Sequence, residues 1–127
     1  MSTQAKGDNV NNKTTVILGG GIGGIVVANE LRHKLRHNHR VVLVERNPEH
    51  AFAPSFLWLM TGDRKSEKIT TPIHRLVRSG IEVLHAEITG INIPNRHITT
   101  TVRTLTYDYA VIALGAELAP ELIPGLA

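Results

Sequence analysis

The sequence predicts an α/β fold in which parallel strands form the core and a helix packs beside them. Three features of its first third predict this fold. A short apolar run rich in β-branched residues, Thr14–Gly19, stops at a cluster of glycines. A helical pattern follows over Ile22–Asn38, and a second apolar run, Arg40–Glu45, ends in a carboxylate. Because continuous apolar strands are typical of a parallel sheet covered on both faces, this order predicts a Rossmann-like βαβ unit.

The predicted helix has one narrow, apolar face. Gly24, Ala28, Leu31 and Leu35 repeat at helical spacing, and the charged residues are expected mostly outside that face: Glu30, Arg32, Lys34 and Arg36. Basic residues crowd the end of this helix and the turn after it. We interpret them as a solvated helix end whose cations complement the helix dipole. The alternative is a weak attraction to anionic lipid or nucleic acid, and the lack of interleaved aromatic residues argues against nucleic acid.

The glycine cluster matches the G-x-G-x-x-G pattern of dinucleotide-binding units. Gly19 permits a tight turn out of the strand, and Gly21 lets the backbone approach a pyrophosphate. Gly24 keeps the helix close to the sheet, and the helix N-terminus offers free N–H groups to phosphates. A flexible glycine loop is the plain alternative. Nucleotide binding is favoured over a flexible loop, because a strand, a helix, a second strand and a terminal acidic residue follow one another in the expected order.

Glu45 is expected to bind the ribose of an adenine dinucleotide. It ends the second predicted strand, where a carboxylate can accept hydrogen bonds from both ribose hydroxyls. The same carboxylate would repel a 2′-phosphate, which disfavours a ligand of the NADP type.

Composition limits the possible functions. The chain has 127 residues, 42% of them apolar and 20% charged, with a net charge of +3, which is typical of one modest globular domain. It has no cysteines, which excludes disulfides, thiolate metal sites and cysteine redox chemistry within this chain. No apolar run approaches the roughly 20 residues that span a bilayer. The polar segment Met1–Lys13 has no periodicity and is expected to be a disordered leader before a domain over residues 14–127.

The segment after the second predicted strand leaves two interpretations open. Residues His50–Gly62 are rich in large apolar side chains, and Pro54 and Ser55 could start a short helix. The segment either covers the core, with Phe56, Trp58 and Leu59 buried, or folds over the ligand with Ala53–Ser55 beside its phosphates. A second short helix is expected from Thr71 to Ser79, because Ile73, Leu76 and Val77 repeat at helical spacing and Gly80 would end it.

The remainder of the chain reads as β-structure. A third strand is expected over Ile81–Ala86, after which Glu87 and Ile88 reach the carboxyl end of the sheet and can meet an adenine ring. Short β-prone pieces separated by turns then predict an antiparallel meander in place of a helical crossover: Ile88–Ile93, Arg96–Val102 and Leu105–Tyr107. A buried strand follows over Asp108–Leu114 and stops at Gly115-Ala116.

Together these residues resemble the FAD domain of flavoproteins that carry two dinucleotide-binding domains. The resemblance rests on GGGIGG with Glu45, the meander, Tyr107–Ala116 and Ile123-Pro124-Gly125. The usual second A-T-G motif is Ala113-Leu114-Gly115 here, so the threonine hydroxyl is lost. Within that superfamily of pyridine nucleotide-disulfide oxidoreductases, APSFLW and Ile69–Arg75 are similar to sulfide:quinone oxidoreductases. Type II NADH dehydrogenases share the first and last motifs.

The resemblance implies a flavin cofactor, FAD. It places the pyrophosphate on the glycine loop, the ribose on Glu45, the adenosine end near Arg46 and the adenine beside Glu87. The residues implied in cofactor binding are Gly19, Gly20, Gly21, Ile22, Gly23, Gly24, Glu45, Arg46, Ala53, Pro54, Glu87, Ile88, Ala113 and Gly115.

In such enzymes sulfide is oxidised through paired cysteines and electrons pass to quinone at a membrane surface. The resemblance therefore implies an N-terminal portion of an FAD-dependent oxidoreductase, an incomplete domain that is inactive alone and lacks a C-terminal portion or companion chain. We expect a cytoplasmic protein that does not bind nucleic acid, with peripheral membrane association only in a full-length parent. The alternatives are an adenine-dinucleotide-binding module without catalysis, a fragment of the type II NADH dehydrogenase kind and an NAD-binding unit, which the meander disfavours.

No catalytic or metal-binding residue is assigned from the sequence. His33 and His37 have the spacing of metal ligands, but no third ligand is evident and both are expected at the surface. Ser55 lacks the strand–turn–helix setting of a nucleophile and has no base placed by the sequence.

Overall fold

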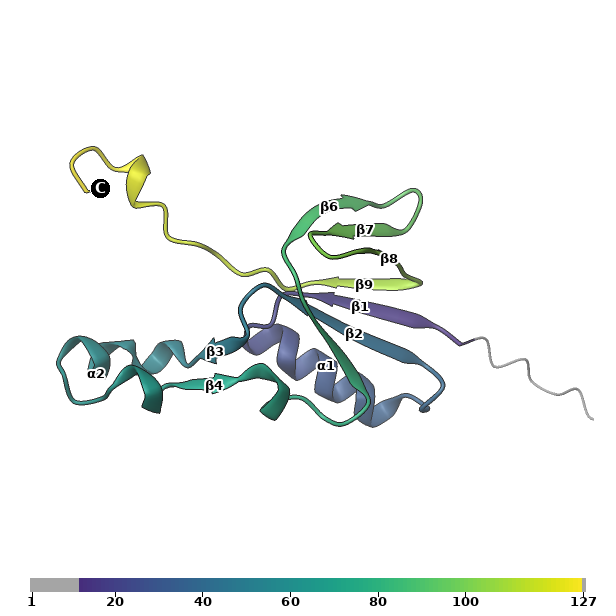
Figure 1. The fold of residues 1–127 in the computed structure, drawn as a ribbon, viewed down its shortest axis with the longest axis horizontal. Helices are drawn as coiled ribbons and strands as arrows, with labels where there is room; N and C mark the ends of the chain where they lie inside the picture. Colours follow the sequence, from purple (N-terminus) through teal and green to yellow (C-terminus); the bar gives the residue numbers. More distant parts are fainter. Residues whose placement is uncertain (1–11, 127) are drawn as a thin grey trace, which may run out of the picture.

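A four-stranded parallel sheet forms the centre of the computed structural model, which describes residues 12–126 (Figure 1). Its order is β5-β2-β1-β9, and every neighbouring pair is parallel. The strands are β1 (Thr14–Leu18), β2 (Arg40–Glu45), β5 (Ile81–His85) and β9 (Tyr109–Ile112). The predicted fold class is therefore confirmed.

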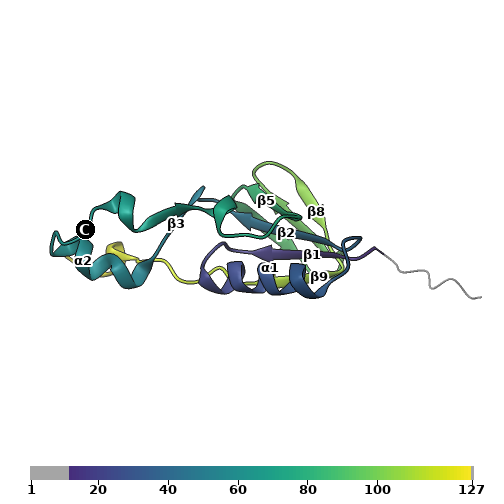
Figure 2. The same ribbon diagram turned by 90° about the horizontal axis from the view of Figure 1, so that it is seen from below.

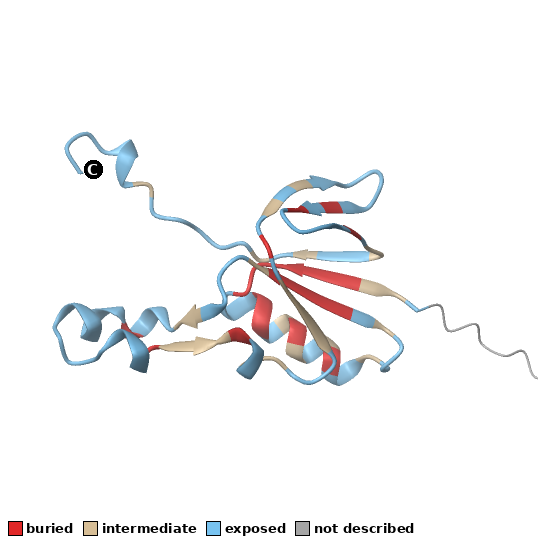
Figure 3. Ribbon diagram, in the orientation of Figure 1, coloured by how far each residue is buried: buried red, intermediate tan, exposed pale blue. Residues whose placement is uncertain are grey.

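The two central strands are buried on both faces. Val16, Ile17 and Leu18 of β1 are fully buried, as is the run Val41–Val44 of β2 (Figure 3). Each contributes side chains alternately to two hydrophobic clusters, one on either side of the sheet. This is the reason that both strands are apolar at every central position, since neither face meets water.

Helix α1 (Ile22–Lys34) covers one face of the sheet (Figure 2). Ala28 and Ile25 pack there against Ile17 and Leu43, and Leu31 lies at the edge of the same cluster. The predicted apolar face of the helix is thus confirmed.

Two predictions about the end of α1 are wrong, and one side chain explains both. Arg32 was expected outside the apolar face, but it is buried, with 6% of its surface exposed. Its guanidinium donates hydrogen bonds to the carbonyl oxygens of Leu35, Arg36 and His39 at 3.2, 2.6 and 2.8 Å. These carbonyls lie past the helix, so the chain leaves the helical path at Leu35 and not at Asn38.

The opposite face of the sheet is covered by the predicted meander. Its strands β6 (Ile88–Asn92), β7 (His97–Thr100) and β8 (Thr104–Thr106) pair antiparallel in sequence order. Ile98 and Leu105 bury their side chains against the β1–β2 cluster. A β-meander therefore connects β5 to β9 and takes the place of a crossover helix.

An arm that projects from the sheet carries the segment between β2 and β5 (Figure 1). Strands β3 (Glu49–Ala51) and β4 (Thr70–Pro72) pair antiparallel at its base, and the short helix α2 (Phe56–Met60) lies at its far end. Three single 3₁₀ turns complete it: Ala53–Ser55, Ser66–Lys68 and Ile73–Arg75.

The arm corrects two expectations. The helix predicted from Thr71 to Ser79 is wrong: residues 70–72 pair with β3, and only the Ile73–Arg75 turn follows, anchored by the buried side chain of Ile73. The core-covering interpretation of the α2 segment is also wrong, because Phe56, Trp58 and Leu59 are 48%, 43% and 39% exposed. Arg64 orders this segment instead, lying over the Trp58 ring and donating to the buried Ser55 hydroxyl at 2.6 Å.

Asp108 ties the start of β1 to the start of β9. Its carboxylate accepts hydrogen bonds from the Thr14 N–H at 2.8 Å and from the Lys13 ammonium at 3.0 Å. The Thr14 bond and then the Lys13 charge hold the pKa of Asp108 below its ordinary value. A depressed pKa in the folded state means that the ionised group stabilises the fold above the unfolded pKa and that this contribution is lost as pH falls.

Replacing Asp108 by Asn is therefore expected to lower the melting temperature at pH 7 and to lower it by less at pH 3. The unfolded pKa is about 3.9, so the advantage of the wild type begins to fall below that pH and is lost as pH falls through the lower, folded pKa. Thermal unfolding followed by circular dichroism at both pH values measures the difference. The exposed Glu121, changed to Gln, is the control. An Asp108→Asn penalty of equal size at both pH values would contradict this assignment.

Candidate functional site

A long open cleft runs along the carboxyl ends of the parallel strands. Its volume is about 1320 Å³, more than the roughly 300–1,000 Å³ of a drug-sized ligand pocket, so it suits a large extended ligand. Four segments line it: the glycine loop after β1, residues 44–51 after β2, residues 85–88 after β5 and residues 113–117 after β9. Ala53 and Phe56 of the arm also reach it. The cleft thus lies where ligands bind in open α/β sheets.

The glycine loop brings three elements into unusually close contact. Gly19 has a φ of +103°, and a Cβ there would lie 2.3 Å from the carbonyl oxygen of Ala113. At Gly24 a Cβ would lie 1.8 Å from the carbonyl oxygen of Gly19. Side chains at these positions would push β9 and α1 away from β1. The glycines therefore set the spacing of the site, as the sequence predicted for the turn and the helix contact.

The start of α1 presents unpaired donors to the cleft. Within residues 12–126, the backbone N–H groups of Gly21, Ile22, Gly23 and Gly24 donate no hydrogen bond, and the first helical bond is from Ile25 to the Gly21 carbonyl. A Cβ on Gly21 or on Gly23 would meet no atom within 4 Å, so open space surrounds these two residues, whereas Gly24 is buried. Together with the partial positive charge of the helix end, this arrangement suits a phosphate group.

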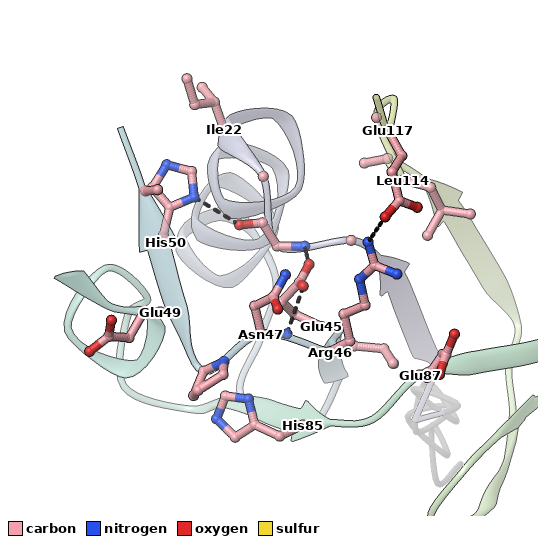
Figure 4. A pocket seen from close by; sticks show the side chains of 18 of the residues that line it. Ile22, Glu45, Arg46, Asn47, Glu49, His50, His85, Glu87, Leu114 and Glu117 are labelled. Carbon is pink, nitrogen blue, oxygen red and sulfur yellow. Dashed lines mark hydrogen bonds and ion pairs between the residues drawn. The ribbon is translucent and has the colours of Figure 1, made fainter. Parts of the chain in front are cut away.

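The Glu45 carboxylate lies beside this loop (Figure 4). One oxygen accepts a hydrogen bond from the Gly20 N–H at 2.6 Å, and the other accepts one from the Asn47 N–H at 2.9 Å. An ionised carboxylate can accept about four hydrogen bonds, so each oxygen keeps acceptor capacity for a ligand hydroxyl. The backbone N–H bonds hold the side chain in place before any ligand arrives.

An ion pair links the end of β2 to the segment after β9. The guanidinium of Arg46 lies 3.2 Å from the carboxylate of Glu117, and both residues line the cleft (Figure 4). The two side chains are 53% and 77% exposed, and surface pairs of this kind contribute about 0–1 kcal/mol. The pair therefore positions the Arg46 side chain at the rim without adding much stability.

The structure gathers most of the predicted cofactor residues at one place. The following line the cleft: Gly19, Gly20, Gly21, Ile22, Glu45, Arg46, Ala53, Glu87, Ile88, Ala113 and Gly115. Gly23, Gly24 and Pro54 do not line it, and Gly24 acts through its contact with Gly19. The roles of all these residues in cofactor binding remain predictions.

Sequence reasoning missed several residues of the cleft. Asn47, His85 and Glu117 line it, and each lies at or just after the carboxyl end of a parallel strand, which is a signal that could have found them. His50 also lines it, and only the pairing of β3 with β4 brings it there.

The described residues offer no metal site. Within residues 12–126, no group of three or more His, Cys, Asp or Glu side chains could hold a metal ion, and His33 and His37 gain no third ligand. Among the helices of this same part of the chain, none has the length and apolar character required to cross a membrane.

The fold and the cleft together define a Rossmann-like nucleotide-binding unit. Comparison with known families is more specific: residues 13–127 match the pyridine nucleotide-disulphide oxidoreductase family. The chain belongs to this family.

Similar proteins agree with this assignment. The sulfide-quinone reductase of Aquifex aeolicus (strain VF5) is 36% identical over 109 residues, which cover 84% of this chain and 25% of the relative. The mitochondrial sulfide:quinone oxidoreductase of Dictyostelium discoideum is 32% identical over 120 residues, covering 87% of this chain and 25% of the relative. The predicted resemblance to sulfide:quinone oxidoreductases is thus confirmed.

Solved structures give the same picture. The Aquifex aeolicus sulfide:quinone oxidoreductase superposes with a TM-score of 0.75 at 33% identity, over 84% of this chain and 25% of that chain. NDH2 from Plasmodium falciparum superposes with a TM-score of 0.74 over 91% of this chain and 24% of that chain, at 23% identity, which supports the fold alone. The chain therefore spans about a quarter of the length of these relatives.

The contact of Gly24 with Gly19 predicts a sharp contrast between neighbouring glycines. Gly24→Ala should destabilise the fold by on the order of 3 kcal/mol, because the new methyl group overlaps a backbone oxygen that cannot move without shifting β1. Gly23→Ala is the matched control. A Cβ at Gly23 meets no atom within 4 Å, so this variant should gain about 0.5–1 kcal/mol from helix propensity.

Urea unfolding of both variants, followed by circular dichroism, measures the two changes. Equal stability of the two alanine variants would show that α1 does not approach β1 as closely as the structure has it.

Proposed function

We propose that this chain binds FAD in the cleft and forms the FAD-binding portion of an oxidoreductase of the sulfide:quinone type. The observation that carries the proposal is the meeting of two complementary groups in one cleft. Free N–H groups at the start of α1 suit a pyrophosphate, and the preorganised Glu45 carboxylate beside them suits ribose hydroxyls. An adenine dinucleotide contains both a pyrophosphate and an adenosine ribose.

The binding roles follow from the position of each segment. The pyrophosphate would lie on the glycine loop, Gly19–Gly24, and the adenosine ribose on Glu45. Arg46 would lie against the adenosine, and Glu87 and Ile88 would frame the adenine. Ala53 and Pro54 would lie under the ribityl and phosphate region, and Ala113 and Gly115 would contact the cofactor again from the end of β9.

Three observations favour FAD over a nicotinamide dinucleotide. The link between β5 and β9 is a β-meander, whereas NAD-binding units usually keep a helical crossover. The relatives of highest identity reported above are named sulfide-quinone reductase and sulfide:quinone oxidoreductase. The negative charge of Glu45 would also repel a ligand with a 2′-phosphate, which disfavours nicotinamide dinucleotides of the NADP type.

Bound FAD would supply the two-electron redox chemistry of the proposed reaction. The residues of this chain would bind and orient the cofactor. The N–H groups of α1 would compensate the pyrophosphate charge, Glu45 would fix the ribose, and the close packing at Gly19 would hold the β9 segment against the cofactor. No residue of this chain is assigned a catalytic role.

Sulfide and quinone are the proposed substrates of the whole enzyme. Because the chain spans about a quarter of its relatives, we infer that activity requires further chain, either continuous with this one or supplied in trans. We place the protein in the cytoplasm, with peripheral membrane association in the complete enzyme.

Type II NADH dehydrogenase is the second candidate for the complete enzyme. The type II NADH:quinone oxidoreductase of Haemophilus influenzae (strain ATCC 51907 / DSM 11121 / KW20 / Rd) favours it, being 29% identical over 120 residues, which cover 83% of this chain and 27% of the relative. The nucleotide-binding role of the cleft would be the same in both cases. A module that binds the dinucleotide without catalysis is the alternative of a different class.

FAD binding is tested by incubating the purified chain with FAD, desalting it and recording its absorption spectrum. Flavin bands near 370 and 450 nm (about the values of the cofactor itself) should remain with the protein. A colourless protein that also shows no FAD binding by titration calorimetry would overturn the proposal. Sulfide-dependent or NADH-dependent bleaching of the bound flavin, with downstream sequence supplied in trans, would then distinguish the two candidate enzymes.

Glu45→Gln should weaken FAD binding about tenfold, because hydrogen bonds to a charged group contribute roughly 1.5–3 kcal/mol and the amide keeps part of them. The same change should reduce the ratio of the affinity for ADP to the affinity for ADP carrying a 2′-phosphate, because the Glu45 charge that repels the 2′-phosphate is lost. Titration calorimetry measures both affinities. Glu30→Gln, on the exposed side of α1, is the matched control and should change neither.

A further inference from the structure

The peptide groups on either side of Gly20 are held by two side chains from outside the glycine loop. Its N–H donates to the Glu45 carboxylate at 2.6 Å, and its carbonyl oxygen lies 3.2 Å from Nδ1 of His50 (Figure 4). Gly20 has no side chain of its own that could fix the orientation of these peptide groups. A Cβ on Gly20 would meet Glu45 at 2.8 Å and Ile73 at 3.0 Å.

The contact with His50 fixes the state of its ring. A carbonyl oxygen only accepts hydrogen bonds, so Nδ1 of His50 must carry the hydrogen. In the neutral ring the proton is then on Nδ1 and absent from Nε2. The imidazolium form also carries a proton on Nδ1, so the hydrogen bond is available in both protonation states.

The orientation of the Gly20 carbonyl determines the direction of a donor in the cleft. The carbonyl of Gly20 and the N–H of Gly21 belong to one planar trans peptide, in which the two groups point in opposite directions. Holding the oxygen against His50 therefore fixes the direction of the Gly21 N–H, opposite to that of the Gly20 oxygen. Gly21 is the first of the N–H groups that donate no hydrogen bond within residues 12–126.

We propose that His50 is a positioning residue for the phosphate-binding loop. Its Nδ1–H holds the Gly20 carbonyl and thereby turns the Gly21 N–H toward the pyrophosphate of a bound dinucleotide. The inference rests on the proposed dinucleotide binding and adds to it a residue thirty positions downstream of the loop. It also gives the base of the arm a role, because β3 carries His50 and is held in place by its pairing with β4.

Asparagine and leucine at position 50 separate the hydrogen bond from the shape of the side chain. In His50→Asn the amide nitrogen takes the place of Nδ1, at the same number of bonds from Cα, and keeps a donor. His50→Leu has a similar branching and no donor. His50→Asp has the shape of asparagine with acceptors only and would repel the carbonyl oxygen.

The Asn variant should keep FAD affinity within about twofold of the wild type, and the Leu variant should lose about tenfold, as expected for one neutral hydrogen bond. The Asp variant should bind at least as weakly as the Leu variant. Titration calorimetry with FAD gives these affinities, and far-ultraviolet circular dichroism establishes that each variant is folded.

A second measurement needs no cofactor. Two-bond ¹H–¹⁵N correlation spectra of the wild-type chain should show the Nδ1–H tautomer for neutral His50. The Gly20 carbonyl ¹³C resonance should keep its position in the Asn variant and move upfield in the Leu variant, because the oxygen loses its donor. This signature depends on the hydrogen bond and would not follow from a general loss of stability.

The outcomes separate this inference from the proposed function. Equal FAD affinity in the wild type and the folded Leu variant would overturn the inference alone. The Nε2–H tautomer of His50, or an unchanged Gly20 resonance in the Leu variant, would also overturn it. A wild-type chain that shows the Nδ1–H tautomer but binds no FAD would overturn the proposed function and leave His50 as a residue that only holds the loop.

Discussion

The close contact between Gly24 and the Gly19 carbonyl is the constraint on which the rest of the site depends. It allows α1 to approach β1 at a distance that a methyl group would prevent. That approach sets where the helix begins, and the start of the helix sets where the free N–H groups lie. Glu45, Asn47 and the segment after β9 are then arranged around a loop whose position is already fixed by packing.

The hydrogen-bonding groups of the cleft lie at the ends of strands whose own side chains are buried and apolar. Val16, Leu18 and Val44 are fully buried, and the strands that carry them end at the cleft. The sheet is covered by α1 on one face and by the meander on the other, so β1 and β2 are packed on both faces, and tight packing on both faces makes a strand rigid. Groups at the ends of rigid strands keep their spacing, which is what a site for an extended dinucleotide requires.

The sequence predicted the sheet, the meander and the loop because each has a local signal, but it was wrong to predict a buried strand over Asp108–Leu114. Strand β9 spans only Tyr109–Ile112, and Tyr109 and Ile112 are 61% and 63% exposed. Continuous β-branched runs, turn residues between short β-prone pieces and the spaced glycines are all visible within a few residues of one another. The secondary structure of the Thr71 segment could not be predicted in this way. Residues 70–72 pair with β3, about twenty residues earlier, and this pairing outweighed the helical spacing of Ile73, Leu76 and Val77. The burial of Arg32 depends on carbonyls three to seven residues later, in a turn that the helical pattern did not describe. The position of His50 depends on a long-range contact with Gly20, thirty residues earlier.

The burial of Arg32 has a consequence for how the βαβ unit can vary. Its guanidinium binds three carbonyl oxygens of the turn between α1 and β2, over the segment 35–39. Two nitrogens of the planar guanidinium share the three carbonyls, and this fork spreads its donors more widely than the compact ammonium of a lysine. The length of this connection is therefore matched to the reach of one side chain. Surface loops generally tolerate insertions, but here an added residue would separate carbonyls that must converge on one cation, so this turn should resist changes in length.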